Sequence, residues 1–527
     1  MTRVYFGTDG IRGKVGQAPL TVDFVLRLAS AAARALAPQG GSVLIGKDTR
    51  LSGYMFEAAL EAGFVAAGLD VRLIGPLPTP GVAFMTRHFG CRFGVVISAS
   101  HNPYYDNGIK FFDAEGGKLS DADEERIEAE LEKPPTTRES RALGRASRVD
   151  KTRKTYQDFC ISTLPPGITL EGMKIVIDCA HGAGYKVAPR ILTDLGAEIV
   201  PIGCSPNGRN INDGCGSTAP HLLQLTVPGV KAQVGIALDG DGDRLVMVDH
   251  LGRKVDGDQL LFVIATARHA AGTLQGPVVG TLMSNYGLER ALRERGIEFH
   301  RAAVGDRYVL EQIRQGGYTL GGEQSGHVIF SRWATTGDGI LTGLKLAAEV
   351  ARTGKPLSEL TKVMSVLPQV LINVVFLQVT HDKGLDLGAE ASFEGRLAVK
   401  NNPEGNALTK FGVAGALTDP TSYGAFYKIL GGNVDATIHA LSSVNKTEIL
   451  SRPSILTRSS QQATILVGQS IPLITNSRVS DTNNTTINTV SYQDVGIILR
   501  VTPFITQAGL VEMIVSPEIS SLSATTI

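Results

Sequence analysis

Short runs of Val, Ile and Leu alternate with helical segments up to about residue 380, and this order constrains the fold most strongly. The runs SVLIG, VRLIG and GVVIS surround the amphipathic stretch 51–68. The order returns with KIVID, QVGIAL and PVVGTL, and with helical segments from about residue 187, over 287–295 and over 339–351. Alternating strands and helices predict βαβ units around parallel sheets.

The chain has 527 residues, which is more than one hydrophobic core usually supports. We therefore predict three consecutive α/β domains, at residues 1–150, 151–255 and 256–366. Beyond about Thr380 the helical periodicity fades, and Ser, Thr and Asn separate strand-like segments such as ATILVGQSIPLIT and VGIILRVTPFIT. Residues 367–527 are therefore predicted to form a different, β-rich structure.

Composition excludes several classes of partner. Basic and acidic residues balance at 51 each, so the chain has no net field for nucleic acid or an anionic membrane. A ligand that carries phosphate must then be held by a local site. The sequence begins without a signal-peptide core and contains no apolar run of membrane-helix length, so we expect a cytoplasmic location. Five cysteines without a CxxC pair favour free thiols over disulfides.

The first motif, ISASHNPYYDNGIK, places hydroxyl groups at the end of an apolar strand. Pro103 restricts the residue before it to an extended conformation, which favours a turn after Ser100 and His101. Ser98 would share the facing direction of Ser100, so it is the competing candidate for a nucleophile. By itself the motif is also compatible with an ordinary polar turn.

The second motif, ALDGDGDRLVMVD, places Asp239, Asp241 and Asp243 directly after an apolar strand. Three carboxylates at this spacing suit Mg²⁺ or Ca²⁺, and their mutual repulsion is costly without a cation. An EF-hand loop that starts at Asp239 would need Gly at its sixth position and Glu at its twelfth. The chain has Arg244 and His250 there, so the EF-hand reading fails.

Two further motifs are weaker when taken alone. The segment GGEQSGH, residues 321–327, offers a carboxylate, an amide, a hydroxyl and an imidazole that could bind sugar hydroxyls. The Gly-rich segment FGTDGIRG carries Arg12, whose guanidinium could grip a phosphate. Either segment could instead be a polar turn.

Together and in this order, the four motifs resemble the α-D-phosphohexomutases over about residues 1–370. The phrases SASHNP, PNGRNINDGCGST and GEQSGH are similar to the phosphoglucosamine mutase branch of that family. The resemblance implies three consecutive α/β phosphohexomutase domains. It also implies an isomerase that interconverts glucosamine 6-phosphate and glucosamine 1-phosphate through a phosphoserine and a bisphosphate intermediate. Such an activity supplies UDP-N-acetylglucosamine and cell-wall precursors.

The resemblance also implies a role for each candidate residue. Ser100 would carry the phosphoryl group, and its phosphate would bind Mg²⁺ together with the three aspartates. The transferring phosphoryl group would be surrounded by Arg12, His101, Lys110 and Arg244. The sugar would face Glu323, Ser325 and His327, with Arg307 of the segment GDRYV nearby. His101, Lys110 and His327 are all candidates for the general base. The expected partner is a phosphosugar and not a nucleic acid. The sequence does not decide whether the chain forms an oligomer.

The sequence departs from the family after about residue 366. The family's fourth domain carries an Arg-x-Ser-Gly-Thr-Glu-Pro loop that grips the non-reacting phosphate, and no such loop occurs in these 527 residues. From Pro368 the chain instead resembles the secretin domain of bacterial secretion and pilus channels, with a seam between Val366 and Val379. Impaired turnover is therefore expected. The alternative function is a secretin-type outer-membrane channel component, which would meet a membrane only if this segment were exported.

Overall fold

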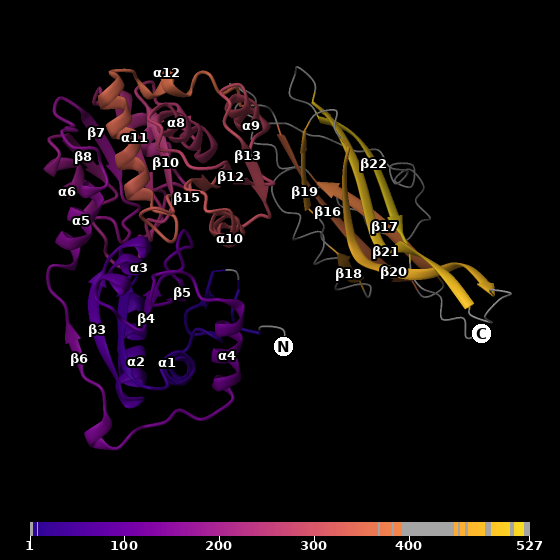
Figure 1. The fold of residues 1–527 in the computed structure, drawn as a ribbon, viewed down its shortest axis with the longest axis horizontal. Coiled ribbons are helices and arrows are strands. Elements are labelled where there is room, and N and C mark those ends of the chain that lie inside the picture. Colours follow the sequence, from indigo (N-terminus) through magenta and orange to yellow (C-terminus); the bar gives the residue numbers. More distant parts are fainter. Residues whose placement is uncertain are drawn as a thin grey trace, which may run out of the picture. The chain divides into compact units, whose positions relative to one another are not determined.

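The computed structural model describes residues 4–7, 9–366, 369–381, 384–392, 447–451, 454–458, 462–479, 486–505 and 511–520. They fall in two compact units, Met1–Val366 and Leu367–Ile527 (Figure 1). Pro368, where the secretin-like resemblance begins, lies outside the described residues.

The first part of unit 1 is built on a six-stranded sheet with the order β1-β5-β4-β2-β3-β6. Strand β2 pairs in parallel with β3 and β4, whereas β5 is antiparallel to both β4 and β1. The strands are β1 (Ile11–Lys14), β2 (Gly41–Lys47), β3 (Leu69–Pro76), β4 (Phe93–Ile97), β5 (Asp106–Phe112) and β6 (Ala146–Arg148).

Helices pack on this sheet through apolar faces at helical spacing. In the second helix, Phe56, Leu60 and Phe64 recur every four residues and are completely buried. The fourth helix begins at a capping residue, Ser120, whose hydroxyl accepts the Asp123 backbone N–H. The helices are α1 (Val22–Leu36), α2 (Leu51–Ala66), α3 (Thr79–His88) and α4 (Asp121–Leu131), with a short 3₁₀ helix, η1 (Ser140–Ala142).

The second part of unit 1 contains a five-stranded sheet with the order β11-β10-β9-β7-β8. Strand β7 is parallel to β8 and β9, and β10 is antiparallel to β9. Its strands are β7 (Lys174–Asp178), β8 (Glu198–Ile202), β9 (Val234–Leu238), β10 (Leu245–Asp249) and β11 (Lys254–Val255). Its helices are α5 (Thr152–Ser162), α6 (Val187–Asp194) and α7 (His221–Gly229).

The third part contains a four-stranded sheet with the order β13-β12-β14-β15. Its first helix, α8, starts with a reciprocal capping box between Asp256 and Gln259. The strands are β12 (Val278–Thr281), β13 (Phe299–Ala302), β14 (Gly321–Gly322) and β15 (Val328–Ile329). The helices are α8 (Gly257–Ala270), α9 (Tyr286–Arg293), α10 (Asp306–Gly316), α11 (Gly339–Thr353) and α12 (Leu357–Thr361).

Each of the three sheets departs from the purely parallel arrangement that the sequence predicts. The antiparallel strands β5, β10 and β15 directly follow the loops that carry the SASHNP, DGDGD and GEQSGH motifs. These loops are too short for a helical crossover, so the chain must turn back as a hairpin. The motifs are therefore presented at strand ends by tight connections.

One hydrophobic cluster joins the three parts of unit 1. It includes Val82 of α3, Ile177 of β7 and Leu261 of α8, all of them buried. A second cluster lies within the first part and includes Val43 and Phe64. Because the parts share a packed core, the loops at their strand ends have defined positions relative to one another.

The described residues of unit 2 form strands alone. In one sheet the central strand β16 pairs with β17, β18 and β19, and in the other the order is β20-β21-β22. Leu499 and Val501 of β21 are completely buried, against Ile465 and Met513 of the neighbouring strands. The strands are β16 (Gln369–His381), β17 (Gly384–Ser392), β18 (Thr447–Ser451), β19 (Ser454–Arg458), β20 (Ala463–Val479), β21 (Thr486–Ile505) and β22 (Val511–Ile519).

The predicted fold class, three α/β domains followed by a β-rich segment, is confirmed. Among the helices in the described part of the chain, none has the length and apolar character that crossing a membrane requires.

Candidate functional site

Ser100 lies in the turn between β4 and β5 and faces the neighbouring sheet. Its backbone adopts φ +51°, a left-handed conformation that few residues other than glycine take. The side chain is buried, and Oγ donates a hydrogen bond to Asp239 Oδ2 at 2.6 Å. His101 Nδ1 lies 3.4 Å from the same Oγ. The turn therefore directs the Ser100 hydroxyl at the acidic loop.

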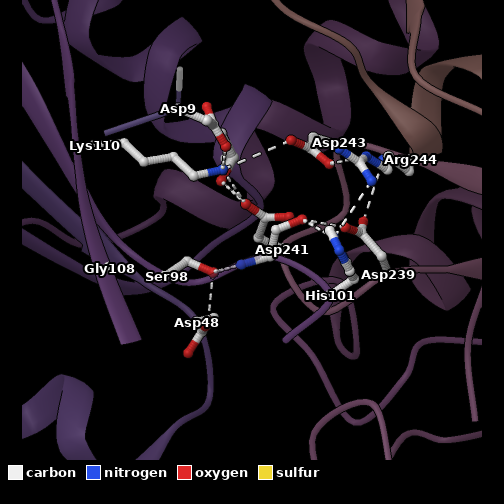
Figure 2. A network of polar contacts seen from close by, with 12 residues as sticks. Asp9, Asp48, Ser98, His101, Gly108, Lys110, Asp239, Asp241, Asp243 and Arg244 are labelled. Carbon is white, nitrogen blue, oxygen red and sulfur yellow. Dashed lines mark hydrogen bonds and ion pairs between the residues drawn. The ribbon is translucent and has the colours of Figure 1, made fainter. Parts of the chain in front are cut away.

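Ser98, the competing candidate, faces a different environment. Its Oγ donates to Asp48 Oδ2 at 2.5 Å and accepts the Ser100 backbone N–H at 3.0 Å (Figure 2). Asp48 also forms a buried ion pair with Arg50. The Ser98 hydroxyl is thus occupied in supporting the turn, whereas the Ser100 hydroxyl meets the acidic loop.

Asp239, Asp241 and Asp243 lie together in the hairpin between β9 and β10. One carboxylate oxygen from each can be chosen so that all three lie within 4.8 Å of one another, and all three side chains are buried. Two oxygens, Asp241 Oδ1 and Asp243 Oδ1, are buried without a hydrogen-bond partner. Buried oxygens without donors are costly, and a bound cation would satisfy them. The loop therefore fits a metal ion.

The three carboxylates have different electrostatic surroundings. Burial raises the pKa of Asp239 well above its usual range, and the charges of Asp243 and Asp241 add to this effect. Burial also acts against ionisation of Asp241. There, however, the Lys110 ammonium and hydrogen bonds from Lys110 and Thr79 hold the pKa below its usual value. The loop concentrates negative charge that a cation would stabilise.

Basic side chains surround the acidic loop. Lys110 Nζ, from β5, lies 2.8 Å from Asp241, 2.9 Å from Asp9 and 3.7 Å from Asp243. Arg244 lies on the other side, with Nη1 3.3 Å from His101 Nδ1 and Nε 3.9 Å from Asp243 (Figure 2).

Arg12, from β1, pairs with Asp9, which ties it to the same network. Arg12, Lys110 and Arg244 are therefore three cationic groups of the network that includes Asp9 and the acidic loop.

The GEQSGH segment forms the connection between β14 and β15. Glu323 accepts the Gly305 backbone N–H at 3.1 Å, and Ser325 Oγ lies 3.4 Å from Glu323 Oε2. His327 is 1% exposed, and its Nε2 accepts the Gly337 N–H at 2.9 Å. The other ring nitrogen, Nδ1, lies 3.8 Å from Asp243. The imidazole is therefore enclosed by protein, next to the acidic loop.

A cavity of about 900 Å³ opens beside Asp243, Arg244 and Glu323. Arg12, Asp243, Arg244, Arg307 and Glu323 are among the residues that line it, while Ser325 and His327 are not. A cavity of this size accommodates a small polar ligand. We expect from the sequence that Glu323, Ser325 and His327 face the sugar. Of these three, only Glu323 lines the cavity.

Arg307 is held at this wall by acidic residues of α4. Its guanidinium lies 2.5 Å from Asp121 and 3.6 Å from Glu124. The pairing joins the first and third parts of unit 1 across the cavity.

Sequence reasoning missed several members of the network. Lys118 Nζ bridges Asp9 at 2.7 Å and Asp306 at 2.6 Å, and so links the first and third parts. Asp9 and Asp306 were detectable, because they lie within the motifs FGTDGIRG and GDRYV. Lys118 lies in the segment EGGKLS, which carries no comparable signal.

Models of known families match four stretches of the chain. The model for phosphoglucomutase/phosphomannomutase alpha/beta/alpha domain I matches residues 3–138, that for domain II matches 154–252 and that for domain III matches 256–366. The secretin model, described as bacterial type II and III secretion system protein, matches residues 440–527.

Solved structures agree with this assignment. A phosphoglucomutase/phosphomannomutase family protein from Burkholderia thailandensis aligns with a TM-score of 0.62 and 27% identity, over 72% of this chain and 82% of its own. A protein described as a phosphomannomutase from Thermus thermophilus aligns with a TM-score of 0.63 and 28% identity, over 74% of this chain and 92% of its own. The fold is thus of the phosphohexomutase class.

Curated relatives show to which branch of the phosphohexomutases the chain is similar. Phosphoglucosamine mutases from Photorhabdus laumondii and Thioalkalivibrio sulfidiphilus are each 58% identical over 375 residues. The alignment covers 71% of this chain and 84% and 83% of those proteins. A phosphoglucosamine mutase from Erwinia tasmaniensis is 55% identical over 401 residues, which is 75% of this chain and 90% of that protein. The chain belongs to the phosphoglucosamine mutase family, and its C-terminal segment matches secretins.

Proposed function

We propose that the chain interconverts glucosamine 6-phosphate and glucosamine 1-phosphate, with Ser100 as the phosphoryl carrier. The observation that carries this proposal is the position of Ser100 Oγ, 2.6 Å from Asp239 of the buried acidic triad. The names of the curated relatives support the choice of an amino sugar phosphate.

Mg²⁺ is the ion that we assign to the triad, because carboxylate oxygens are the ligands it prefers. Asp239, Asp241 and Asp243 would hold it together with an oxygen of phosphorylated Ser100. When bound, the ion would neutralise negative charge on the transferring phosphoryl group.

The cationic side chains complete the charge balance. Arg12 and Arg244 line the cavity, and Lys110 lies between Asp9 and the triad. Phosphoryl transfer depends mainly on positioning and on stabilising charge on the equatorial oxygens, which is the role we give to these three residues.

The sugar must lose a hydroxyl proton to a general base. Burial opposes the charge on Lys110, but Asp241, Asp9 and Asp243 outweigh it and raise its pKa. Lys110 therefore stays an ammonium, which makes it a charge-stabilising group and a poor base. Burial, with Arg244 and Arg12 nearby, lowers the pKa of His101, so its imidazole is neutral near pH 7 and able to accept a proton. His327 remains the other candidate.

Recognition of the sugar is assigned to Glu323, Ser325 and His327, with Arg307 beside them. The geometry favours Glu323 and Arg307 for direct contact, because both line the cavity. We assign a supporting role to Ser325, whose hydroxyl lies within reach of Glu323. We also propose a domain division at residues 1–150, 151–255, 256–366 and 367–527, and a cytoplasmic location.

Turnover is expected to be slow. The 527 residues contain no Arg-x-Ser-Gly-Thr-Glu-Pro loop to anchor the non-reacting phosphate. Each charge-assisted hydrogen bond to a phosphate contributes about 1.5–3 kcal/mol. Misplacement of the reacting end by about 1 Å can reduce the rate by a further ~100-fold.

The test is a steady-state assay that measures glucosamine 1-phosphate formed from glucosamine 6-phosphate. The purified chain is compared with a chimera in which a complete mutase C-terminal domain replaces the residues after Val366, and with Ser100→Ala as the blank. We expect slow but Ser100-dependent turnover and a much faster chimera. Equal rates would overturn the claim of an incomplete site, and the absence of Ser100-dependent product in both proteins would overturn the proposed activity.

The match of residues 440–527 to secretins favours a second candidate, a channel component of a secretion or pilus system. Cell fractionation separates the two. The mutase is expected in the soluble fraction, and a secretin in heat-resistant multimers of the outer membrane.

A further inference from the structure

The backbone of Ser100 is strained, and its neighbours must hold it in place. A left-handed conformation brings Cβ too close to the following carbonyl oxygen, so it is unfavourable for a residue with a side chain. Such conformations persist where surrounding contacts fix them, and they often occur at functional sites. The contacts that fix φ +51° at Ser100 therefore decide where its hydroxyl points.

Two side chains from different parts of unit 1 hold the carbonyl of this residue. Asn212 Nδ2 donates to Ser100 O at 2.9 Å, and Arg50 Nη2 donates to the same oxygen at 3.2 Å. The same two groups also donate to the carbonyl of Asn102. The carbonyls of Ser100 and Asn102 thus accept hydrogen bonds from the same two side chains.

The two donors differ in how they are supported. Arg50 lies in the connection between β2 and α2, is completely buried and pairs with Asp48. Asn212 comes from the segment between β8 and α7, and its backbone N–H donates to Ala180 O at 3.0 Å. Asn212 itself has φ +58°, which asparagine tolerates better than most residues.

The acidic loop also packs closely against the Ser100 carbonyl and the Asn212 amide. A Cβ placed on Gly240 would lie 2.6 Å from Ser100 O and 2.7 Å from Asn212 Nδ2. Only glycine therefore lets the loop between Asp239 and Asp241 approach so closely. The Asn212 amide lies where the Ser100 turn, the acidic loop and the β8–α7 segment meet.

We propose that Asn212 is a positioning residue for phosphoryl transfer, which holds the Ser100 carbonyl so that the Ser100 hydroxyl faces the acidic triad. The proposal rests on the proposed role of Ser100 as phosphoryl carrier. The two carbonyls would keep their Arg50 contacts without the amide, so loss of Asn212 should disturb the turn more than the fold. Asn212 lies within the phrase PNGRNINDGCGST, in which no residue has a role predicted from sequence.

The informative variant is Asn212→Gly, because glycine accepts φ +58° and removes only the amide. Asn212→Asp is the second variant, since it keeps the size of the side chain but takes away two N–H donors. The matched control is Asn207→Gly, an exposed asparagine of the same segment, whose Oδ1 accepts the Arg209 N–H at 2.8 Å. Asn207 has no hydrogen bond to the Ser100 turn among the described contacts.

The experiment measures how fast the dephosphorylated full chain takes up a phosphoryl group from a hexose 1,6-bisphosphate, by intact mass. Both Asn212 variants should lower the rate at saturating donor by about 10- to 100-fold. The donor concentration at half-maximal rate and the Mn²⁺ affinity, followed by electron paramagnetic resonance, should change less than about 2-fold. The Asn207 variant should match the wild type.

Each outcome separates a positioning role from a structural one. Unchanged uptake in folded Asn212→Gly and Asn212→Asp would overturn the proposal and leave the role of Ser100 intact. A loss of Mn²⁺ affinity equal to the loss of rate would also overturn it, because Asn212 would then act through the metal loop. If the wild-type chain takes up no phosphoryl group, both the proposal and the proposed function fail.

Discussion

Lys110 and Asp241 form a buried ion pair in which Nζ lies 2.8 Å from Oδ2, between a strand of the first sheet and the acidic loop of the second. The lysine side chain is 4% exposed and that of the aspartate 1%. The pair keeps both groups ionised, because Asp241 raises the pKa of Lys110 and Lys110 lowers the pKa of Asp241. It therefore links strand β5 of the first sheet and the acidic loop of the second electrostatically.

Removing this lysine should make stability depend on divalent cations. Lys110→Met leaves Asp241 without its ammonium partner, and breaking a buried pair in this way costs about 3–5 kcal/mol. A bound cation would replace part of the lost charge. We expect Mg²⁺ to raise the thermal midpoint of Lys110→Met more than that of the wild type. Lys118→Met, which also loses an Asp9 pair, is the control. Equal Mg²⁺ shifts in all three proteins would refute the account.

Asp241→Asn should weaken metal binding and phosphoryl transfer together. The substitution removes one of three anionic ligands, and the wild-type Oδ1 has no hydrogen-bond partner to compensate. We expect at least a ~10-fold loss of Mn²⁺ affinity by electron paramagnetic resonance, with the fold retained. Asp113→Asn, a half-buried carboxylate outside the triad, should bind Mn²⁺ as the wild type does. Wild-type Mn²⁺ affinity in Asp241→Asn would remove the metal assignment.

The fold class and the acidic loop were predictable because local sequence encodes them directly. Hydrophobic strands followed by glycines and polar residues mark strand ends, and the spacing of Asp239, Asp241 and Asp243 lies within one hairpin. The antiparallel strands were not predicted, since an apolar run looks the same in either direction. Their direction is decided by connection length, which becomes informative only once the strand ends are known.

The contacts that hold the site residues in place could not be predicted from the sequence, for a different reason. Asn212 and Ser100 are 112 residues apart, and Lys118 and Asp306 are 188 apart. Such pairs depend on how the parts of unit 1 pack, which no local pattern records. His327 illustrates the same limit, because no local pattern shows that its ring is enclosed next to Gly337.

Asp338 should make stability depend on pH. Burial raises its pKa from 3.8 to about 6, although hydrogen bonds from the Leu341 N–H and the Tyr156 hydroxyl oppose the shift. The folded state then binds more protons than the unfolded state between pH ~4 and ~6, so this contribution falls as pH rises through that window. The wild type should lose on the order of 1–3 kcal/mol relative to Asp338→Asn between pH 4.5 and 7. Urea unfolding at both pH values measures this difference, and parallel changes in the two proteins would exclude it.

The site of phosphorylation tests the central claim most directly. The full chain is incubated with a hexose 1,6-bisphosphate and Mg²⁺, and the peptide that contains Ser98 and Ser100 is sequenced by mass spectrometry. Because Ser98 Oγ is bound to Asp48 while Ser100 Oγ faces Asp239, we predict the phosphoryl group on Ser100. Ser98→Ala should retain it and Ser100→Ala should lose it. A phosphoryl group on Ser98, or on no serine of this turn, would contradict the account.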